Sequence, residues 1–466
     1  MFTQLRIQNF KAWRDTGNIR LAPLTVFFGP NSSGKTSLLQ LLLLLQQSEQ
    51  SSDRKRVLHF GDDHSVVDLG VYPEMVFRHE PQRELRFALK WRVPGTHQGP
   101  TRGAGTEARE TKVAFKASVG STSGDAGPIS VHSFQYSVCA PLINLGPTTI
   151  KMRRDDVAGG YELSTRGNDI QRKPGASGQL SAPVRFYGFP REAAVQYVDT
   201  EGLFDQFEQA LEVQLDSICY LGPLRELPAR YYSWSGEAPV DVGLDGDRTI
   251  EALLAAMTRT LEPSGGNPVR FGELIAKWLL RMELLDSFEV RPIAPNRKDY
   301  EVLVRSRGSA ETVKLTDVGL GISQVLPVLV QAFYVDPGSV VLLEQPELHL
   351  HPRAQSSLAD LFIDAIRMWE DESPRDIQLL VESHSEHFLR RLQRRIAEGK
   401  LSPDETALYF CSPGPEGSTI EKLQVDKYGR IANWPENFFG DAIGDTEHQM
   451  DAMLRRMEQE EPNASG

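Results

Sequence analysis

Residues 29–36 read GPNSSGKT and match the phosphate-binding loop G-x-x-x-x-G-K-[ST] at every fixed position. The preceding segment, Leu24–Phe28, is apolar and typical of a short buried strand, and Thr36–Gln47 is leucine-rich and typical of a helix. A strand, a glycine loop and a helix in this order form the structural context that the motif requires. These flanks argue against a glycine-rich turn that fits the pattern by chance, and they predict a site for a nucleoside triphosphate.

The loop and the first turn of the helix supply the groups that a bound triphosphate needs. Glycines let the backbone curl so that its N–H groups point at the α- and β-phosphates, and the helix N-terminus adds the positive end of its dipole. Lys35 is expected to reach the β- and γ-phosphates, and the Thr36 hydroxyl to bind Mg²⁺. The residues predicted to bind the cofactors ATP and Mg²⁺ here are Asn31, Ser32, Ser33, Gly34, Lys35, Thr36 and Ser37.

Composition limits the class of protein. The chain has 466 residues, of which 40% are hydrophobic, enough for two or three structural units with sizeable cores. The apolar run Leu41–Leu45 is far shorter than the roughly 20 residues that a membrane span needs. Cys139, Cys219 and Cys411 are widely separated, which indicates free thiols in a reducing cytoplasm. The net charge of −12 argues against a surface that binds nucleic acid everywhere, and it leaves DNA contact through a local basic channel open.

A second block of patterned sequence ends in acidic residues. Ser339–Glu347 reads SVVLLEQPE, the pattern with which a buried strand delivers a carboxylate to the sheet edge beside a metal ion. Glu344 is therefore the predicted Mg²⁺-side carboxylate. A further strand is expected at Ile377–Val381, and His384 lies just past its end, where it can hydrogen-bond a γ-phosphate. A lone histidine is more often a packing or surface residue, and the P-loop favours the functional role here.

We expect an α/β fold, with a P-loop ATPase head that a large mixed α+β insertion interrupts between the glycine loop and the second block. The insertion contains segments rich in Gly, Ser, Thr and Pro at 94–111 and 119–128, which are predicted to be exposed hairpin loops. The predicted division is an N-lobe with the P-loop (1–80), an inserted arm or lid (81–300), a C-lobe (301–425) and a C-terminal segment (426–466).

Several motifs appear in a fixed order along the chain: GPNSSGKT (29–36), DVGLGISQVLPVL (317–329), VVLLEQPELHLHP (340–352) and VESHSEH (381–387). This series resembles the ABC-type ATPases of the RecF, OLD and SMC-like branch, often labelled AAA ATPases in bacteria. LRIQNFKAW (5–13) resembles the opening strand of that branch, which implies that Lys11 lies near the nucleotide base. The segments YLGPLRELPARYY (220–232) and YGRIANWPENFF (428–439) resemble a bacterial subgroup with a C-terminal domain of unknown function.

The resemblance implies that two subunits hold ATP between them, head to tail. The helix that begins around Gly319–Gln324 would then cap the γ-phosphate bound to Lys35 of the other subunit, because its glycine-rich N-terminus offers further N–H donors. Gly321 and Ser323 are the predicted contacts, and Thr316 is the alternative to Ser323 as the signature residue. A homodimer or a higher homo-oligomer closed by ATP is expected.

One position departs from the family pattern. The strand end in these ATPases usually carries Asp and then Glu, a metal ligand followed by a general base, whereas this chain carries Glu344 and then Gln345. An amide orients water but accepts no proton, and general-base assistance is worth about 10²–10⁴ in rate. Slow turnover or nucleotide-gated binding is therefore predicted. Glu347 and Glu382 are the candidate substitutes for the base, and the predicted catalytic set is Gln345, Glu347 and His384.

Three classes of function remain. The favoured one is an ATP-dependent switch that works with a separate effector, as in the resembling anti-phage systems such as Septu, which pair such an ATPase with a nuclease. The second is a stand-alone DNA-repair or chromosome-maintenance ATPase, for which a long heptad-rich arm or a basic stripe is expected and neither is visible. The third, a cytoplasmic subunit of a transporter, is disfavoured by the long separation between the motifs.

Overall fold

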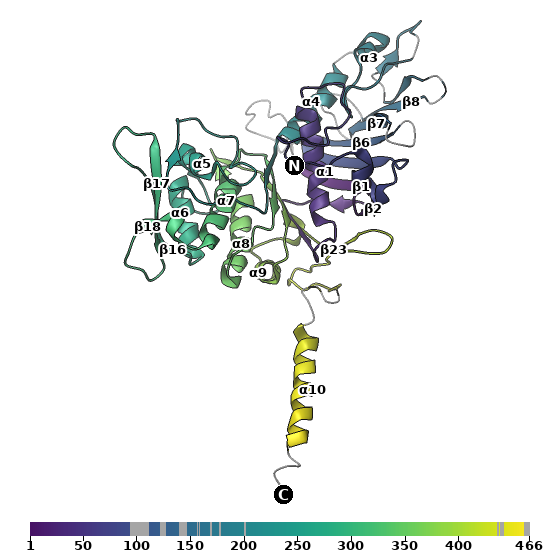
Figure 1. Cartoon of the computed structure of the whole chain (residues 1–466). Coiled ribbons are helices and arrows are strands. Elements are labelled where there is room, and N and C mark those ends of the chain that lie inside the picture. Colours follow the sequence, from purple (N-terminus) through teal and green to yellow (C-terminus); the bar gives the residue numbers. More distant parts are fainter. Residues whose placement is uncertain are drawn as a thin grey trace, which may run out of the picture.

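The computed structural model describes residues 1–93, 111–121, 127–138, 147–155, 157, 159–167, 170–176, 179–199, 202–435, 438 and 442–460. A six-stranded sheet forms its centre (Figure 1). In spatial order the strands are β12 (Ile218–Leu221), β19 (Val340–Glu344), β22 (Gln378–Glu382), β4 (Leu24–Phe28), β23 (Thr406–Ser412) and β24 (Thr419–Lys422). All neighbours run parallel except β23 and β24. β19, β22 and β4 are buried at every position, as is usual for parallel strands with both faces covered.

Side chains of the central sheet alternate between two hydrophobic cores. Leu24, Val26 and Phe28 of β4 belong to one core, and Phe27 belongs to the other. The first core is completed by α5 (Thr249–Ala256), α6 (Phe271–Arg281), α7 (Leu320–Tyr334), α8 (Pro352–Ile366) and α9 (Glu386–Ala397). The second is completed by α1 (Lys35–Gln50) and α4 (Leu203–Asp216). The predicted α/β class is thus confirmed.

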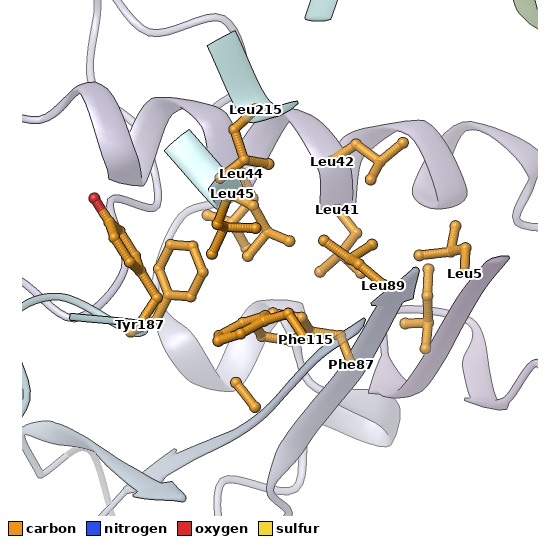
Figure 2. Close-up of a cluster of buried hydrophobic side chains, with 14 of the residues drawn as sticks. Leu5, Leu41, Leu42, Leu44, Leu45, Phe87, Leu89, Phe115, Tyr187 and Leu215 are labelled. Carbon is orange, nitrogen blue, oxygen red and sulfur yellow. The ribbon is translucent and has the colours of Figure 1, made fainter. Parts of the chain in front are cut away.

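An antiparallel sheet of eight strands covers the outer side of α1. Its order is β2 (Trp13–Asp15), β1 (Phe2–Phe10), β5 (Leu85–Val93), β6 (Thr111–Ser121), β7 (Ile129–Val138), β8 (Thr148–Arg154) and β9 (Tyr161–Arg166), with β3 (Ile19–Arg20) also paired with β1. Figure 2 shows leucines of α1 directed at Leu5, Phe87, Leu89 and Phe115 of this sheet. Leu41–Leu45 are all fully buried, because α1 has a sheet on either side.

Smaller elements complete the described chain. A four-stranded sheet contains β13 (Tyr232–Ser233), β17 (Asp299–Ser306), β16 (Leu285–Pro292) and β18 (Val313–Lys314). The two-stranded sheets are β10 (Ile170–Arg172) with β11 (Tyr197–Asp199), β14 (Thr260–Leu261) with β15 (Val269–Arg270), and β20 (Trp369–Glu370) with β21 (Ser373–Pro374). The other helices are α2 (Tyr72–Met75), α3 (Arg191–Gln196) and α10 (Ala442–Glu460), and 3₁₀ turns lie at Phe77–His79, Leu315–Asp317 and Pro403–Glu405. Every helix in the described ranges is too short or too polar to cross a membrane.

Two features of the fold depend on pairing and on backbone conformation. The first strand, Phe2–Phe10, lies in the antiparallel sheet, whereas the P-loop strand lies in the central one. α6 ends at Arg281, because Glu283 has a positive φ of 59° and β16 then begins.

The predicted domain division is not decided by the fold. Within the stretch 81–300, β5 pairs with β1 and β12 pairs with β19, so this stretch contributes to both large sheets. The four-part division stays a prediction. The hairpin loops predicted at 94–111 and 119–128 lie largely outside the described residues.

Replacing Leu42 by Ala is expected to destabilise the chain by about 2–5 kcal/mol, because a fully buried side chain between two sheets would leave a cavity. Leu224→Ala is the matched control, since 83% of the Leu224 side chain is exposed. Chemical denaturation of both variants measures the difference. Equal unfolding midpoints would contradict the burial of α1.

Candidate nucleotide-binding site

The glycine-rich loop joins β4 to α1 at the carboxyl edge of the central sheet. Gly29 has a φ of 141° and Gly34 a φ of 86°, values that residues with a side chain rarely adopt. A Cβ atom on Gly29 would lie 2.1 Å from the carbonyl oxygen of Cys411 on β23. The close approach of the loop to β23 therefore requires glycine at the first fixed position of the motif.

Trp13 supports the loop from the antiparallel sheet. Its side chain is fully buried, and its indole N–H donates to the carbonyl oxygen of Gly34 at 3.0 Å. A Cβ on Gly34 would lie 3.0 Å from the same indole nitrogen. The contact connects the hairpin of β1 and β2 directly to the start of α1.

The Lys35 side chain is folded into the loop. Its Nζ donates to the carbonyl oxygens of Gly29 at 3.0 Å and Pro30 at 2.7 Å, and it lies 3.9 Å from the Glu382 carboxylate. Only 2% of the side chain is exposed, and this burial lowers the pKa of Lys35 below its ordinary value while Glu382 opposes the change. An ammonium group held by two carbonyl oxygens can exchange them for phosphate oxygens without leaving the loop.

Glu382 ends β22 and faces the first turn of α1. The Thr36 hydroxyl donates to Glu382 Oε2 at 2.8 Å, and the Gln345 side chain also hydrogen-bonds this carboxylate. Burial raises the pKa of Glu382, and the bond from Thr36 opposes that rise. From the sequence, Glu382 was predicted only as a candidate substitute for the base. The missed signal is that Ile377–Val381 is an apolar run ending in a carboxylate, the same pattern that identified Glu344.

Glu344 lies beside Glu382, because the two residues are register partners at the ends of parallel strands. The Tyr220 hydroxyl donates to Glu344 Oε1 at 3.0 Å. Burial, together with repulsion from Glu382, raises the pKa of Glu344 to about 7. The Tyr220 contact was not anticipated, although its position in an apolar run before a turn resembles the other strands of this sheet.

These oxygen groups fit Mg²⁺ held jointly with a nucleotide. Mg²⁺ is usually bound by one or two carboxylates together with substrate phosphates, and not by a cage made only of protein ligands. The Thr36 hydroxyl and the carboxylates of Glu344 and Glu382 supply such a partial set. In the described part of the chain, no group of three His, Cys, Asp or Glu side chains is arranged to hold a metal alone.

The Glu347 carboxylate is more deeply buried than its predicted role as a general base requires. Its Oε1 accepts a hydrogen bond from the His384 backbone N–H at 2.5 Å, and burial raises its pKa. The buried Arg225 guanidinium lies near enough to interact electrostatically with Glu347, and its Nη2 donates to the Glu344 carbonyl oxygen at 3.1 Å. Arg225 and Glu347 thus hold the turn that follows β19 in place.

His384 faces the P-loop. Burial, together with the positive charge of Lys35, lowers the pKa of His384 to about 4, and a hydrogen bond with the Gly29 backbone opposes this shift. The imidazole is therefore neutral at pH 7. A neutral imidazole beside Lys35 can donate one hydrogen bond to a phosphate oxygen.

A pocket of about 470 Å³ brings most of the predicted residues together. It is lined by Lys11, Ala12, Asn31, Ser32, Ser33, Gly34, Lys35, Thr36, Ser37, Gln345, Glu382 and His384. Lys11 reaches it with its Nζ donating to Gln40 at 2.6 Å. Glu344 lies next to the pocket, because it is the register partner of Glu382. Glu347 does not line the pocket.

Gly321 and Ser323 lie elsewhere on the same chain. Both belong to the first turns of α7, and the Ser323 hydroxyl donates to the carbonyl oxygen of Leu320 at 2.8 Å. Neither residue lines the nucleotide pocket of its own subunit. Their predicted contact with ATP on a second subunit stays a prediction.

Three family matches cover most of the chain. Residues 1–80 match the family described as "AAA ATPase domain", and residues 184–390 match "AAA domain, putative AbiEii toxin, Type IV TA system". Residues 401–449 match "Protein of unknown function (DUF3696)". The P-loop falls inside the first of these AAA matches, and Glu344 and His384 fall inside the second, so these two parts of the chain are similar to AAA-type ATPase domains.

Solved structures of SMC head domains are similar to the chain over most of its length. One is an SMC head bound to the C-winged helix domain of ScpA, with 11% identity, a TM-score of 0.42 and coverage of 92% of this chain and 99% of that one. Another is the SMC head domain from Thermotoga maritima, with 11% identity, a TM-score of 0.37 and coverage of 91% and 99%.

A third is the Smc head with an extended coiled coil, bound to the C-terminal domain of ScpA derived from Pyrococcus furiosus. It has 9% identity, a TM-score of 0.37 and coverage of 91% of this chain and 97% of that one. No curated protein matches the chain in sequence.

The Gly29→Ala variant is expected to lose binding of a fluorescent ATP analogue, because the added methyl group would collide with the Cys411 carbonyl and displace the loop. Gly17→Ala is the matched control: its φ is 63°, yet no atom lies within 4 Å of the added Cβ. The control should lose about 1 kcal/mol of stability and keep nucleotide binding. Unchanged binding by Gly29→Ala would contradict the assignment of the pocket.

Proposed function

We propose that this protein is an ATP-binding, slowly hydrolysing ATPase that acts as a nucleotide-gated switch subunit. The observation that carries the proposal is the single pocket shared by Lys35, Thr36, Gln345 and His384, with an amide where the family pattern has a carboxylate. The AAA family matches support ATP as the nucleotide.

Each residue has a proposed role in binding MgATP. Lys35 neutralises the β- and γ-phosphates, and the loop amides and the N-terminus of α1 bind the α- and β-phosphates. Thr36 and Glu344 ligate Mg²⁺, which would stabilise charge that develops on the transferred phosphoryl group. To bind the metal, the Thr36 hydroxyl would give up its hydrogen bond with Glu382, whose carboxylate lines the same pocket. Lys11, whose Nζ donates to Gln40, lines the pocket and would lie beside the base or ribose.

Hydrolysis is slow in this proposal because the pocket supplies no well-placed base. The Gln345 amide orients a water molecule without accepting its proton, and Glu347 is held by the His384 backbone outside the pocket. Glu382 is therefore the better placed substitute, although its carboxylate already accepts from Thr36 and Gln345. His384 donates a hydrogen bond to the γ-phosphate, so this contact forms with ATP and not with ADP.

ATP binding then closes a homodimer through Gly321 and Ser323 of the opposite subunit, in the cytoplasm. Leu320, beside these residues, has 51% of its surface exposed, which is compatible with a contact between subunits. We propose that the closed form controls a separate effector, a nuclease in an anti-phage system, following the family resemblance. One matched family is described by a toxin of a toxin–antitoxin system, which is compatible with a two-component role. The alternative is a stand-alone DNA-repair ATPase of the RecF or SMC-like type.

The Gln345→Glu variant is expected to raise the ATPase kcat by up to about 10², because it restores a group that accepts a proton from water. Phosphate release under saturating MgATP measures the rate, and ATP affinity is measured alongside it. Glu289→Gln, which removes an exposed carboxylate on β16, is the matched control and should leave kcat within about twofold. A brisk wild-type rate that Glu347→Gln abolishes would identify Glu347 as the base instead.

Light scattering tests the switch itself. The wild-type protein should double its mass when MgATP is added and return to a monomer with ADP, because the γ-phosphate contacts both subunits. Lys35→Ala removes the phosphate-neutralising ammonium and should stay monomeric under both conditions. A mass that does not depend on nucleotide would overturn the nucleotide-gated dimer.

A further inference from the structure

The backbone at Gln345 is held in a conformation that a residue with a side chain rarely adopts. Its φ is 43°, in the left-handed region, which persists only where the surrounding structure imposes it. The Gln345 N–H donates to the Glu382 carbonyl oxygen at 2.9 Å, and the Gln345 carbonyl oxygen accepts from the Leu348 N–H at 3.1 Å. The Glu344 carbonyl oxygen, on the same peptide unit as the Gln345 N–H, accepts from Arg225 Nη2 at 3.1 Å. Every polar atom of this strained peptide is therefore held.

Arg225 reaches the peptide from the segment that follows β12. The residue is 7% exposed, and burial lowers the pKa of Arg225 to about 10, so the guanidinium stays charged at pH 7. Its Nε and Nη1 make no hydrogen bond with any residue that the structure describes. Buried donors without partners lower stability, so a guanidinium that served the fold alone would be expected to pair them. The contact made by Nη2 is the better explanation for this arginine.

Glu347 supplies the opposite charge on the far side of the turn. Its carboxylate favours the charged form of Arg225 and so opposes the effect of burial on the pKa of the guanidinium. Glu347 Oε1 accepts from the His384 N–H, and Oε2 is buried without a hydrogen-bond partner among the described side chains and backbone. Arg225 thus binds the carbonyl oxygen before Gln345 and attracts the carboxylate two residues after it. Both sides of the water-orienting position depend on one guanidinium.

The main chain of Arg225 connects this turn to α7. The Arg225 carbonyl oxygen accepts from Gln324 Nε2 at 3.5 Å. Gln324 is buried and directly follows Ser323, one of the predicted contacts with a second subunit. A displacement of the first turns of α7 would therefore reach Gln345 through Arg225.

We propose that Arg225 is the positioning residue for ATP hydrolysis, and that it holds the peptide between Glu344 and Gln345 so that the Gln345 amide faces the γ-phosphate. This role rests on the proposed hydrolysis in the nucleotide pocket and deepens it, because it names the residue through which contact at α7 reaches the water-orienting amide. Arg225 does not line the pocket, so it acts on the rate of hydrolysis and leaves ATP affinity to the P-loop.

The Arg225→Lys variant tests this role through its rate and its affinity. The substitution keeps the positive charge and replaces the planar guanidinium by an ammonium group with a different geometry. Single-turnover phosphate release should fall about 10-fold to 10²-fold, as expected when a catalytic group is misplaced, while the Kd for a fluorescent ATP analogue stays within about twofold. A role limited to charge balance predicts the wild-type rate. Arg248→Lys, at an arginine with 57% of its side chain exposed, is the matched control and should keep both values.

Chemical rescue provides a second readout. Arg225→Ala leaves space beside the Glu344 carbonyl oxygen and should lose rate as Arg225→Lys does. Guanidinium chloride, at concentrations that leave the protein folded, should restore part of the rate, because the free cation supplies the missing donors. Urea has a similar shape without the charge and should not restore it. Equal effects of the two compounds would contradict a role for the charged donors.

The outcomes separate this role from the proposed function. A wild-type protein that releases no more phosphate than Lys35→Ala overturns the hydrolytic function, and the role of Arg225 with it. A wild-type protein that hydrolyses ATP, together with an unchanged rate in Arg225→Lys, overturns the role of Arg225 alone. A parallel loss of rate and ATP affinity, including a loss through misfolding, also overturns it, because Arg225 would then serve only the fold.

Discussion

The burial of α1 between two sheets is the constraint on which the rest of the molecule depends. α1 begins with Lys35 and Thr36. Its burial therefore places its first turn at the edge of the central sheet, where the phosphates bind. Its leucines fill the space between that sheet and the antiparallel one, and Gln46 anchors it further by donating to the Ile218 carbonyl oxygen of β12. Five consecutive leucines, Leu41–Leu45, cover a full turn of the helix because the helix is buried on every side there. A movement of either sheet would therefore displace the phosphate-binding loop.

Local sequence patterns predicted the elements around the P-loop well and the topology less well. Leu24–Phe28, the glycine loop and α1 follow from a run of apolar residues, a motif and a helical run, all of them contiguous in sequence. The hydrogen bond from Trp13 to Gly34 and the bond from Tyr220 to Glu344 join residues from different elements, and no local pattern encodes such pairs. The strand order β19–β22–β4 places Glu382 between Glu344 and the P-loop, which spacing along the chain does not reveal.

The same strand order explains why Gln345 is compatible with a folded site. Glu344 and Glu382 already stand side by side, and each raises the free energy of ionising the other. A third carboxylate at position 345 would add to this repulsion, whereas the amide hydrogen-bonds Glu382 and adds no charge. The amide thus favours a stable pocket before Mg²⁺ and ATP arrive, and the loss of a base is its catalytic cost.

The outer face of the antiparallel sheet shows how the fold, and not the total charge, decides where charge gathers. Lys90, Lys116 and Lys151 are dispersed over three strands, and each is flanked in sequence by residues that point into the core. The sequence therefore shows no basic stripe, and the total charge is negative. Pairing of β5 to β8 brings these cations together on the outer face within about 10–20 Å.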